Sequence, residues 1–171
     1  TQMEHGREYD DVLADAQRRG YAEADPTNDV AGYDALAKTV ILANVVLGGD
    51  LRPKEVPCEG ITKITKEDVV GALRKGRRIK LIGQASTKGG EVVAEVSPQE
   101  LPLTDPLANI EGVLNAITLK TDATGDVTVV GPGAGGRTAG YALLSDLLSI
   151  SGAIGKSGCG STIQRVDMSF I

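Results

Sequence analysis

The sequence predicts an α+β fold: a mixed, largely antiparallel sheet with helices packed on one face. Apolar residues recur at helical spacing in some stretches and with a period of two in others. The stretches with a period of two are joined by short turns, which is typical of hairpins and of antiparallel sheets. The predicted strands are 77–85, 91–97, 113–120 and 125–130, and the first two flank the turn Lys88-Gly89-Gly90.

The first two helices follow from the spacing of apolar residues. Tyr9, Val12, Leu13 and Ala16 lie on one face of an amphipathic helix over 7–19, and a glycine follows where a helix C-cap is expected. A second helix is predicted over 32–47, after an acidic loop over 21–31. Almost every position of this helix is apolar, so we expect most of its circumference to be buried.

Weaker signals complete the order of elements. Residues 55–59 suggest a short strand. Thr65 and Asp68 resemble a capping box that opens a helix over 66–75. A last helix over about 136–149 precedes a tail rich in Gly and Ser. We therefore predict one domain over 1–150 and a C-terminal tail, 151–171, to which the sequence assigns no role.

Composition excludes several classes of function. A net charge of −5 disfavours nonspecific nucleic-acid binding, and the short basic cluster 74–78 is explained by a solvated turn. His5 is the only histidine, which excludes a His-cluster metal site, and we predict no metal. Cys58 and Cys159 are far apart, as expected of reduced thiols in a cytoplasmic protein. No apolar run is long enough for a membrane span, so we predict no membrane partner.

One glycine motif invites a nucleotide-binding interpretation that we discount. A strand runs into 131–136, which satisfies G-x-G-x-x-G before a helix. Few residues follow that helix, too few for further βα units, and Pro132 removes one N–H from the loop. A tight strand-to-helix turn, or a loop that lets a ligand approach the backbone, are the two interpretations left open.

The candidate site lies at the start of the second helix. Asp34 and Lys38 are four residues apart on one face, close enough to pair. The preceding loop adds the acids Glu23, Asp25 and Asp29. This grouping indicates a polar pocket, although a buried salt bridge would explain the pair alone. Asp25 before a proline is also typical of a turn, and Asp29 could be the helix N-cap.

The same region carries a family resemblance. The segment from Gly20 to Lys38 reads G-Y-x-E-x-D-P-x-x-D-x-x-G-x-D-x-x-x-K, which resembles the signature of homoserine dehydrogenases. Asn115-Ala116 and the glycine loop 131–135 also resemble that family, and the similarity runs to about residue 150. The long motif is highly specific, whereas the glycine loop alone is weak.

The resemblance implies an activity and site roles. It implies an NAD(P)-dependent oxidoreductase that interconverts L-homoserine and L-aspartate 4-semialdehyde, on the path to threonine and methionine. Lys38 would be the catalytic acid/base with Asp34 beside it, Glu23 would bind the substrate amino group, and Asp29 would line the site. Gly135 would approach the cofactor, NAD or NADP. The resemblance also implies a homodimer formed through the sheet.

The chain departs from the family in one respect. The family's dinucleotide-binding domain would precede Thr1, so we interpret the sequence as the substrate-binding and catalytic half of a longer enzyme. The cofactor would then be bound mainly by a domain absent from this chain. Two alternatives stay open: a non-catalytic amino-acid-binding or regulatory module, and an unrelated oxidoreductase of similar two-domain build.

Overall fold

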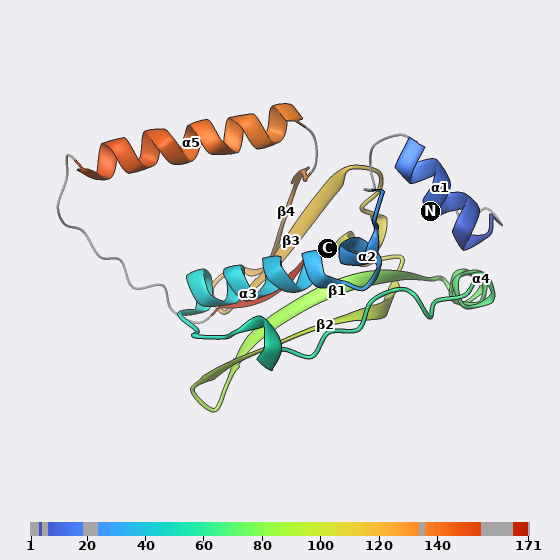
Figure 1. Cartoon of the computed structure of the whole chain (residues 1–171). Coiled ribbons are helices and arrows are strands. Elements are labelled where there is room, and N and C mark those ends of the chain that lie inside the picture. Colours follow the sequence, from blue (N-terminus) through green and yellow to red (C-terminus); the bar gives the residue numbers. More distant parts are fainter. Residues whose placement is uncertain (1–3, 5–6, 19–23, 134–135, 155–165, 171) are drawn as a thin grey trace.

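The computed structural model describes residues 4, 7–18, 24–133, 136–154 and 166–170 (Figure 1). Along the described chain most helices come first and most strands follow, the segregation expected of an α+β protein. In chain order the elements are α1 (Tyr9–Arg18), α2 (Thr27–Val30), α3 (Tyr33–Leu47), the 3₁₀ turn η2 (Pro53–Glu55), α4 (Lys66–Arg74), β1 (Arg77–Lys88), β2 (Glu91–Pro102), the 3₁₀ turn η3 (Pro106–Asn109), β3 (Leu114–Thr121), β4 (Gly125–Pro132), α5 (Gly136–Ile154) and β5 (Val166–Phe170).

The strands form one five-stranded sheet in the order β2-β1-β5-β3-β4, and every pair of named strands is antiparallel. The predicted first hairpin is confirmed, and both strands extend beyond their predicted ends. Its turn contains Gly89 and Gly90 at φ +61° and +92°, backbone angles that L residues rarely adopt. The α+β fold class is thus as predicted.

The two faces of the sheet are covered differently (Figure 1). Helix α3 packs on one face, where Leu36 and Val40 meet Val96 of β2 in a buried cluster that also includes Val56. On the opposite face η3 folds over the sheet, and its Leu107 contributes to the second core cluster. The buried members of that cluster are Ile82, Leu107, Ile110 and Ala116.

Helix α3 is less buried than its composition predicts. Only Leu36, Thr39, Val40 and Ala43 are buried. The apolar side chains of Tyr33, Ile41 and Val45 are 53%, 61% and 77% exposed. A single sheet face covers only one side of a helix, so the expectation that most of its circumference is buried was wrong.

The weaker sequence signals had mixed outcomes. The capping box is present: the Asp68 N–H donates to Thr65 Oγ1 at 3.1 Å, and Asp68 Oδ2 accepts from the Thr65 N–H at 2.9 Å. The predicted strand 55–59 is reduced to a single parallel bridge between Cys58 and Val96. Conversely, the acidic loop contains α2, and the tail contributes β5 between β1 and β3.

The basic cluster is more than a solvated turn. Arg78 is only 20% exposed in its side chain and pairs with Glu111 at 3.0 Å and with Glu4 at 3.4 Å. The neighbouring Lys80 donates to the Ile110 carbonyl at 2.6 Å. Burial lowers the pKa of Lys80. Arg78 and Lys80 therefore link β1 to residues 110–111 through an ion pair and a hydrogen bond, which is a structural role.

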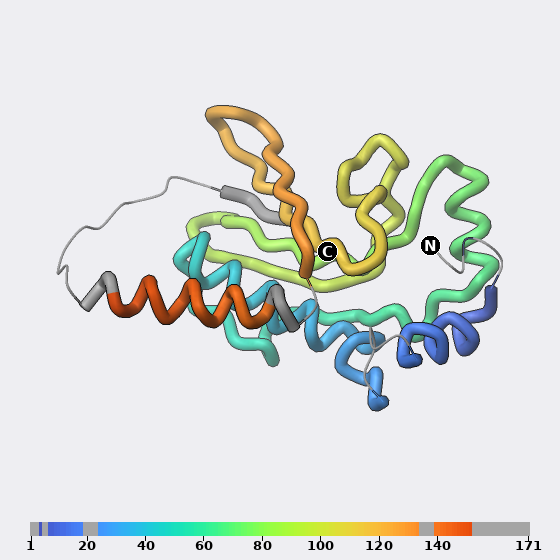
Figure 2. The backbone as a smooth tube through the Cα atoms, turned by 90° about the horizontal axis from the view of Figure 1, so that it is seen from above, coloured from blue at the N-terminus to red at the C-terminus, as the bar shows by residue number. Residues whose placement is uncertain are grey.

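Helix α5 stands apart from α3 and the sheet in Figure 1, whereas in Figure 2, seen from above, it crosses α3 in projection. Every residue over 139–151 is exposed. Monomeric proteins rarely expose so much contiguous apolar surface. The large apolar side chains that are more than half exposed are Tyr141, Leu143, Leu144, Leu147, Leu148 and Ile150.

Candidate functional site

The predicted pair is formed at the start of α3. Lys38 Nζ lies 2.7 Å from Asp34 Oδ2, a charge-assisted hydrogen bond between successive turns of the helix. Asp34 belongs to the first turn, which the positive end of the helix dipole favours for an acid. The two groups thus share one face of α3, near the end that follows α2.

The pair is open to solvent rather than buried. The side chains of Lys38 and Asp34 are 48% and 49% exposed. The alternative explanation of the pair as a simple buried salt bridge is therefore wrong. An exposed i, i+4 pair contributes little to stability. At this exposure a ligand can reach both groups.

The acids of the preceding segment divide into different roles. Asp25 Oδ1 accepts from Thr27 Oγ1 at 2.6 Å and from the Thr27 N–H at 3.1 Å, and these bonds lower the pKa of Asp25. Asp25 thus shapes the turn into α2, as the sequence suggested. Asp29 is exposed on α2. It is not the N-cap of α3, because that position is Gly32 at φ +84° with no side-chain cap.

Two of the predicted site residues, Glu23 and Gly135, lie outside the described residues. The described part of the glycine loop ends at Gly133, whose N–H donates to the Val113 carbonyl at 2.8 Å. A Cβ at Gly133 would fall on the side chain of Asn115. A side chain here would thus displace the Asn115 amide, and this close packing supports the tight-turn interpretation at that position.

A cavity of about 490 Å³ lies elsewhere, on the sheet face opposite α3. Its wall is partly polar, and Thr118 and Thr128 are hydrogen bonded to each other at 2.9 Å across β3 and β4. None of the predicted site residues is among those that line it, which are Ile82, Gln84, Gln99, Leu101, Pro102, Thr104, Asp105, Pro106, Leu107, Thr118, Lys120, Asp126 and Thr128.

Within the described ranges no group of His, Cys, Asp and Glu side chains is arranged to hold a metal ion. The helices of that same part of the chain include none with the length and hydropathy to cross a membrane.

Sequence reasoning missed the segment 57–61, which contacts the corner between α2 and α3. The Ile61 N–H donates to the Val30 carbonyl at 2.8 Å, and Gly60 packs on the backbone of Ala31. The one available signal was Gly60 itself, which directly follows the predicted strand 55–59, since a glycine can mark a close backbone approach.

The sequence is similar to known proteins of one family. The family model described as Homoserine dehydrogenase matches residues 1–148. An NAD(+)-dependent homoserine dehydrogenase of Pseudomonas canavaninivorans is 43% identical over 88% of this chain and 43% of its own length. The homoserine dehydrogenase of Lactococcus lactis is 42% identical over 87% of this chain and 36% of its own length.

Solved structures give the same result. The crystal structure of a homoserine dehydrogenase from Thiobacillus denitrificans covers 88% of this chain at a TM-score of 0.83 and 38% identity, and 35% of that chain is matched. A hyperthermophilic archaeal homoserine dehydrogenase mutant in complex with NADPH has a TM-score of 0.66 and 31% identity over 86% of this chain and 41% of its own. The chain thus spans less than half the length of these relatives. It belongs to the homoserine dehydrogenase family.

Proposed function

We propose that this chain is the substrate-binding and catalytic portion of an NAD(P)-dependent homoserine dehydrogenase, an oxidoreductase that interconverts L-homoserine and L-aspartate 4-semialdehyde. The observation that carries the proposal is the 2.7 Å pair of Lys38 and Asp34, which lies inside the family's signature segment. Membership of the family supports the reaction class. The half-exposed ammonium is accessible to a substrate oxygen.

Lys38 is the proposed acid/base. In the oxidation of homoserine, the neutral amine would take the hydroxyl proton, and the hydrogen on the same carbon would leave as hydride to NAD or NADP. In the reverse direction, the ammonium returns that proton to the oxygen of the aldehyde as hydride arrives. Asp34 accepts a hydrogen bond from Nζ, and so it orients the amine.

Carboxylates before α3 would hold the substrate's ammonium group. Glu23 is proposed to bind it, and Asp29 to line the same pocket from α2. A carboxylate is the natural partner for an ammonium group because the hydrogen bond is charge-assisted. Only residues 31–32 separate α2 from α3. Asp29, on α2, therefore lies shortly before Asp34 in the first turn of α3.

The described residues do not fit a complete dinucleotide site. Pro132 has no N–H, and the Gly133 N–H already donates to Val113, so this part of the glycine loop offers few amides to a phosphate. We therefore propose that NAD or NADP is bound mainly outside this chain, with Gly135 approaching it. The Pseudomonas relative is NAD(+)-dependent, and the archaeal relative is in complex with NADPH, so both cofactors occur among relatives.

Titration calorimetry with L-homoserine tests the pocket. We expect saturable binding by the wild type and by Lys63→Ala, which removes a comparable surface ion pair with Glu59. We expect binding to be lost in Glu23→Ala and weakened in Lys38→Ala. Undiminished binding by both site variants would contradict the proposed pocket, and so would the absence of binding by the wild type.

The proposed partner is a second copy of the chain, bound through the sheet. Strand β4 is an edge strand, and its Val127, Val129 and Val130 are exposed. An exposed apolar edge strand readily pairs with another chain. Sedimentation should show a dimer for the wild type and a monomer for Val129→Lys. A wild-type monomer, or a variant dimer of unchanged affinity, would contradict this interface.

A further inference from the structure

Segment 57–61 connects the edge of the sheet to the corner between α2 and α3. On the sheet side, the Val96 N–H donates to the Pro57 carbonyl at 2.9 Å, and the Glu59 N–H donates to the Val96 carbonyl at 2.8 Å. On the helix side, the Ile61 N–H donates to the Val30 carbonyl at 2.8 Å. Backbone bonds therefore run from β2, through this segment, to the last residue of α2.

The contact on the helix side leaves no room for a side chain. A Cβ at Gly60 would lie 2.5 Å from both the carbonyl carbon and the Cα of Ala31, and closer still to the Val30 oxygen. Real Cβ atoms essentially never approach so closely, and backbone atoms cannot rotate aside. The backbone of Val30 and Ala31, at the corner between α2 and α3, thus packs directly against the backbone of Gly60.

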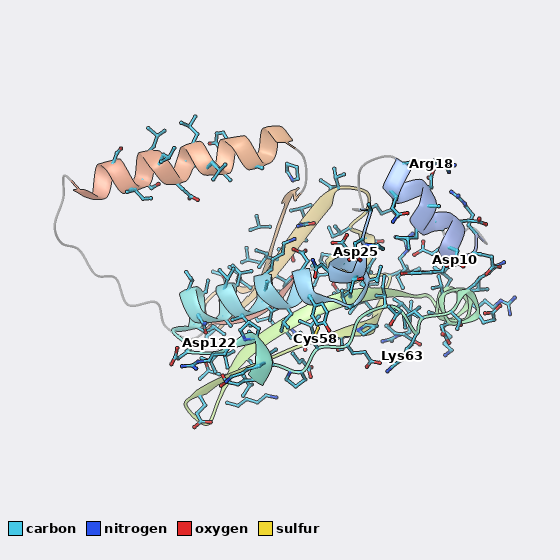
Figure 3. The ribbon with its side chains drawn as sticks, in the orientation of Figure 1. Asp10, Arg18, Asp25, Cys58, Lys63 and Asp122 are labelled. Atoms are coloured by element: carbon cyan, nitrogen blue, oxygen red, sulfur yellow. The ribbon has the colours of Figure 1, made fainter. Side chains whose placement is uncertain are left out.

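Gly32 completes this packing from the other side. It is the N-cap of α3 at φ +84°, and a Cβ there would lie 3.2 Å from Cys58 Sγ and 3.5 Å from the Gly60 Cα. Cys58 Sγ lies 3.5 Å from the Gly32 carbonyl oxygen, to which it donates. Figure 3 shows Cys58 beside the first part of α3. Burial raises the pKa of this thiol, so Cys58 packs here as a neutral group.

We propose that Gly60 is a positioning residue. By holding the corner at residues 30–32 against the edge of the sheet, segment 57–61 sets where α3 begins. It thereby sets where Asp34 and Lys38 stand relative to the rest of the fold. Their role in the reaction rests on the proposed function, whereas their placement by Gly60 does not.

The geometry explains why the position would be sensitive. Asp34 and Lys38 lie in the first two turns after Gly32, so a displacement of the corner moves both together. Their mutual 2.7 Å bond lies within one helix and would survive such a shift. A misplacement of about 1 Å is enough to cost roughly a hundredfold in rate when it falls on reacting groups.

The test compares Gly60→Ala with two matched variants of the full chain. Gly71→Ala makes the same chemical change in α4, where a Cβ meets nothing within 4 Å. Leu107→Ala destabilises the core on the opposite sheet face without touching the corner. Amide NMR shifts over residues 30–38 and the exchange rate of the Ile61 N–H report placement, and calorimetry with L-homoserine reports binding.

We expect Gly60→Ala to shift the amides of residues 30–38, to speed exchange of the Ile61 N–H at least tenfold, and to weaken homoserine binding at least tenfold while the protein stays folded. Gly71→Ala should change none of these. Leu107→Ala should lower the melting temperature and leave the corner and the affinity unchanged at temperatures where it is folded. If Gly60→Ala does not fold, Cys58→Ala serves instead, with the same shifts expected and a severalfold loss of affinity.

Unchanged corner amides in the folded Gly60→Ala protein would overturn the proposal. A displaced corner with wild-type affinity would overturn the part of the proposal that makes this placement matter for binding. If the wild type fails to bind homoserine, the proposed function fails in this chain, and the NMR measurement still decides whether Gly60 places Asp34 and Lys38.

Discussion

Lys38 Nζ and Asp34 Oδ2 are 2.7 Å apart on a face of α3 where both side chains are about half exposed. The chain offers a natural comparison, since Lys63 and Glu59 have the same sequence spacing and lie 3.2 Å apart. The second pair is the more exposed, at 80% and 57%. Two ion pairs of the same sequence spacing thus differ in length and exposure, and we propose a catalytic role for only the Lys38–Asp34 pair.

The Lys38–Asp34 pair should contribute little to folding. Exposed i, i+4 pairs stabilise helices by only about 0.3–0.5 kcal/mol. We therefore expect Lys38→Ala to change the free energy of unfolding by no more than ~0.5 kcal/mol in urea titrations, as for Lys63→Ala. A loss of several kcal/mol would show that Lys38 is a structural residue and would undermine any functional interpretation of the variant.

Ile82 should matter far more for stability. Its side chain is 1% exposed, in the core cluster between the sheet and η3. Truncation of a buried isoleucine removes transfer energy and leaves a cavity, so Ile82→Ala should lower the free energy of unfolding by about 2–5 kcal/mol. Val93→Ala, at a side chain 38% exposed on β2, is the control and should cost much less. Equal effects would mean that this cluster is not the core we describe.

The capping box of α4 gives a prediction for Thr65. Replacing an N-cap threonine by alanine typically costs about 1 kcal/mol, so Thr65→Ala should lower the free energy of unfolding by that amount. The Thr65 hydroxyl accepts from the Asp68 N–H at 3.1 Å, and alanine cannot replace it. Thr65→Ser keeps the acceptor and should restore most of the stability. If serine and alanine are equivalent, the hydroxyl does not cap the helix.

The contribution of Asp68 to the free energy of unfolding should depend on pH, and it should decrease on acidification. The N–H and then the hydroxyl of Thr65 hold the pKa of Asp68 below its usual value. A depressed pKa stabilises the fold above the unfolded-state pKa of about 3.9, and this stabilisation is lost as the pH falls through the folded-state pKa. The stability difference between wild type and Asp68→Asn should therefore shrink between about pH 5 and pH 3. A difference that grows on acidification would contradict the hydrogen bonds.

Helix α5 should tolerate changes to its apolar face. Leu147 is 64% exposed, so Leu147→Ala removes no buried contact within the described chain. We expect its free energy of unfolding to change by less than ~0.5 kcal/mol, as for other exposed positions. A loss above 2 kcal/mol at low protein concentration would show that α5 packs on the chain itself.

The sequence predicted those helices and strands that are marked by a pattern within the segment itself. The period-two stretches predicted both hairpins, and Thr65 with Asp68 predicted the start of α4. Residues 166–170 read V-D-M-S-F, which alternates as a strand should, yet nothing local says that β5 lies between β1 and β3. Pairing between segments far apart in the chain depends on tertiary contacts that periodicity does not encode.

The candidate site was only partly predicted, because some of its features are local to α3 and others depend on tertiary contacts. The i, i+4 spacing of Asp34 and Lys38 fixed their pairing, because a helix determines it alone. Their exposure was mispredicted, because the burial of α3 depends on how much of it one sheet face covers. Gly60 was missed because its role lies in contact with a corner some thirty residues earlier in the chain.

The most direct test joins to this chain the part of the NAD(+)-dependent Pseudomonas canavaninivorans relative that the chain does not match, and follows homoserine-dependent reduction of NAD+. The variants to compare are wild type, Lys38→Ala and the matched Lys63→Ala. Loss of a general acid/base predicts that Lys38→Ala lowers kcat by about 10²–10⁴-fold, while Lys63→Ala keeps wild-type activity. A Lys38→Ala enzyme that stays within a few-fold of wild type would contradict the assignment of Lys38 as the residue that moves the proton.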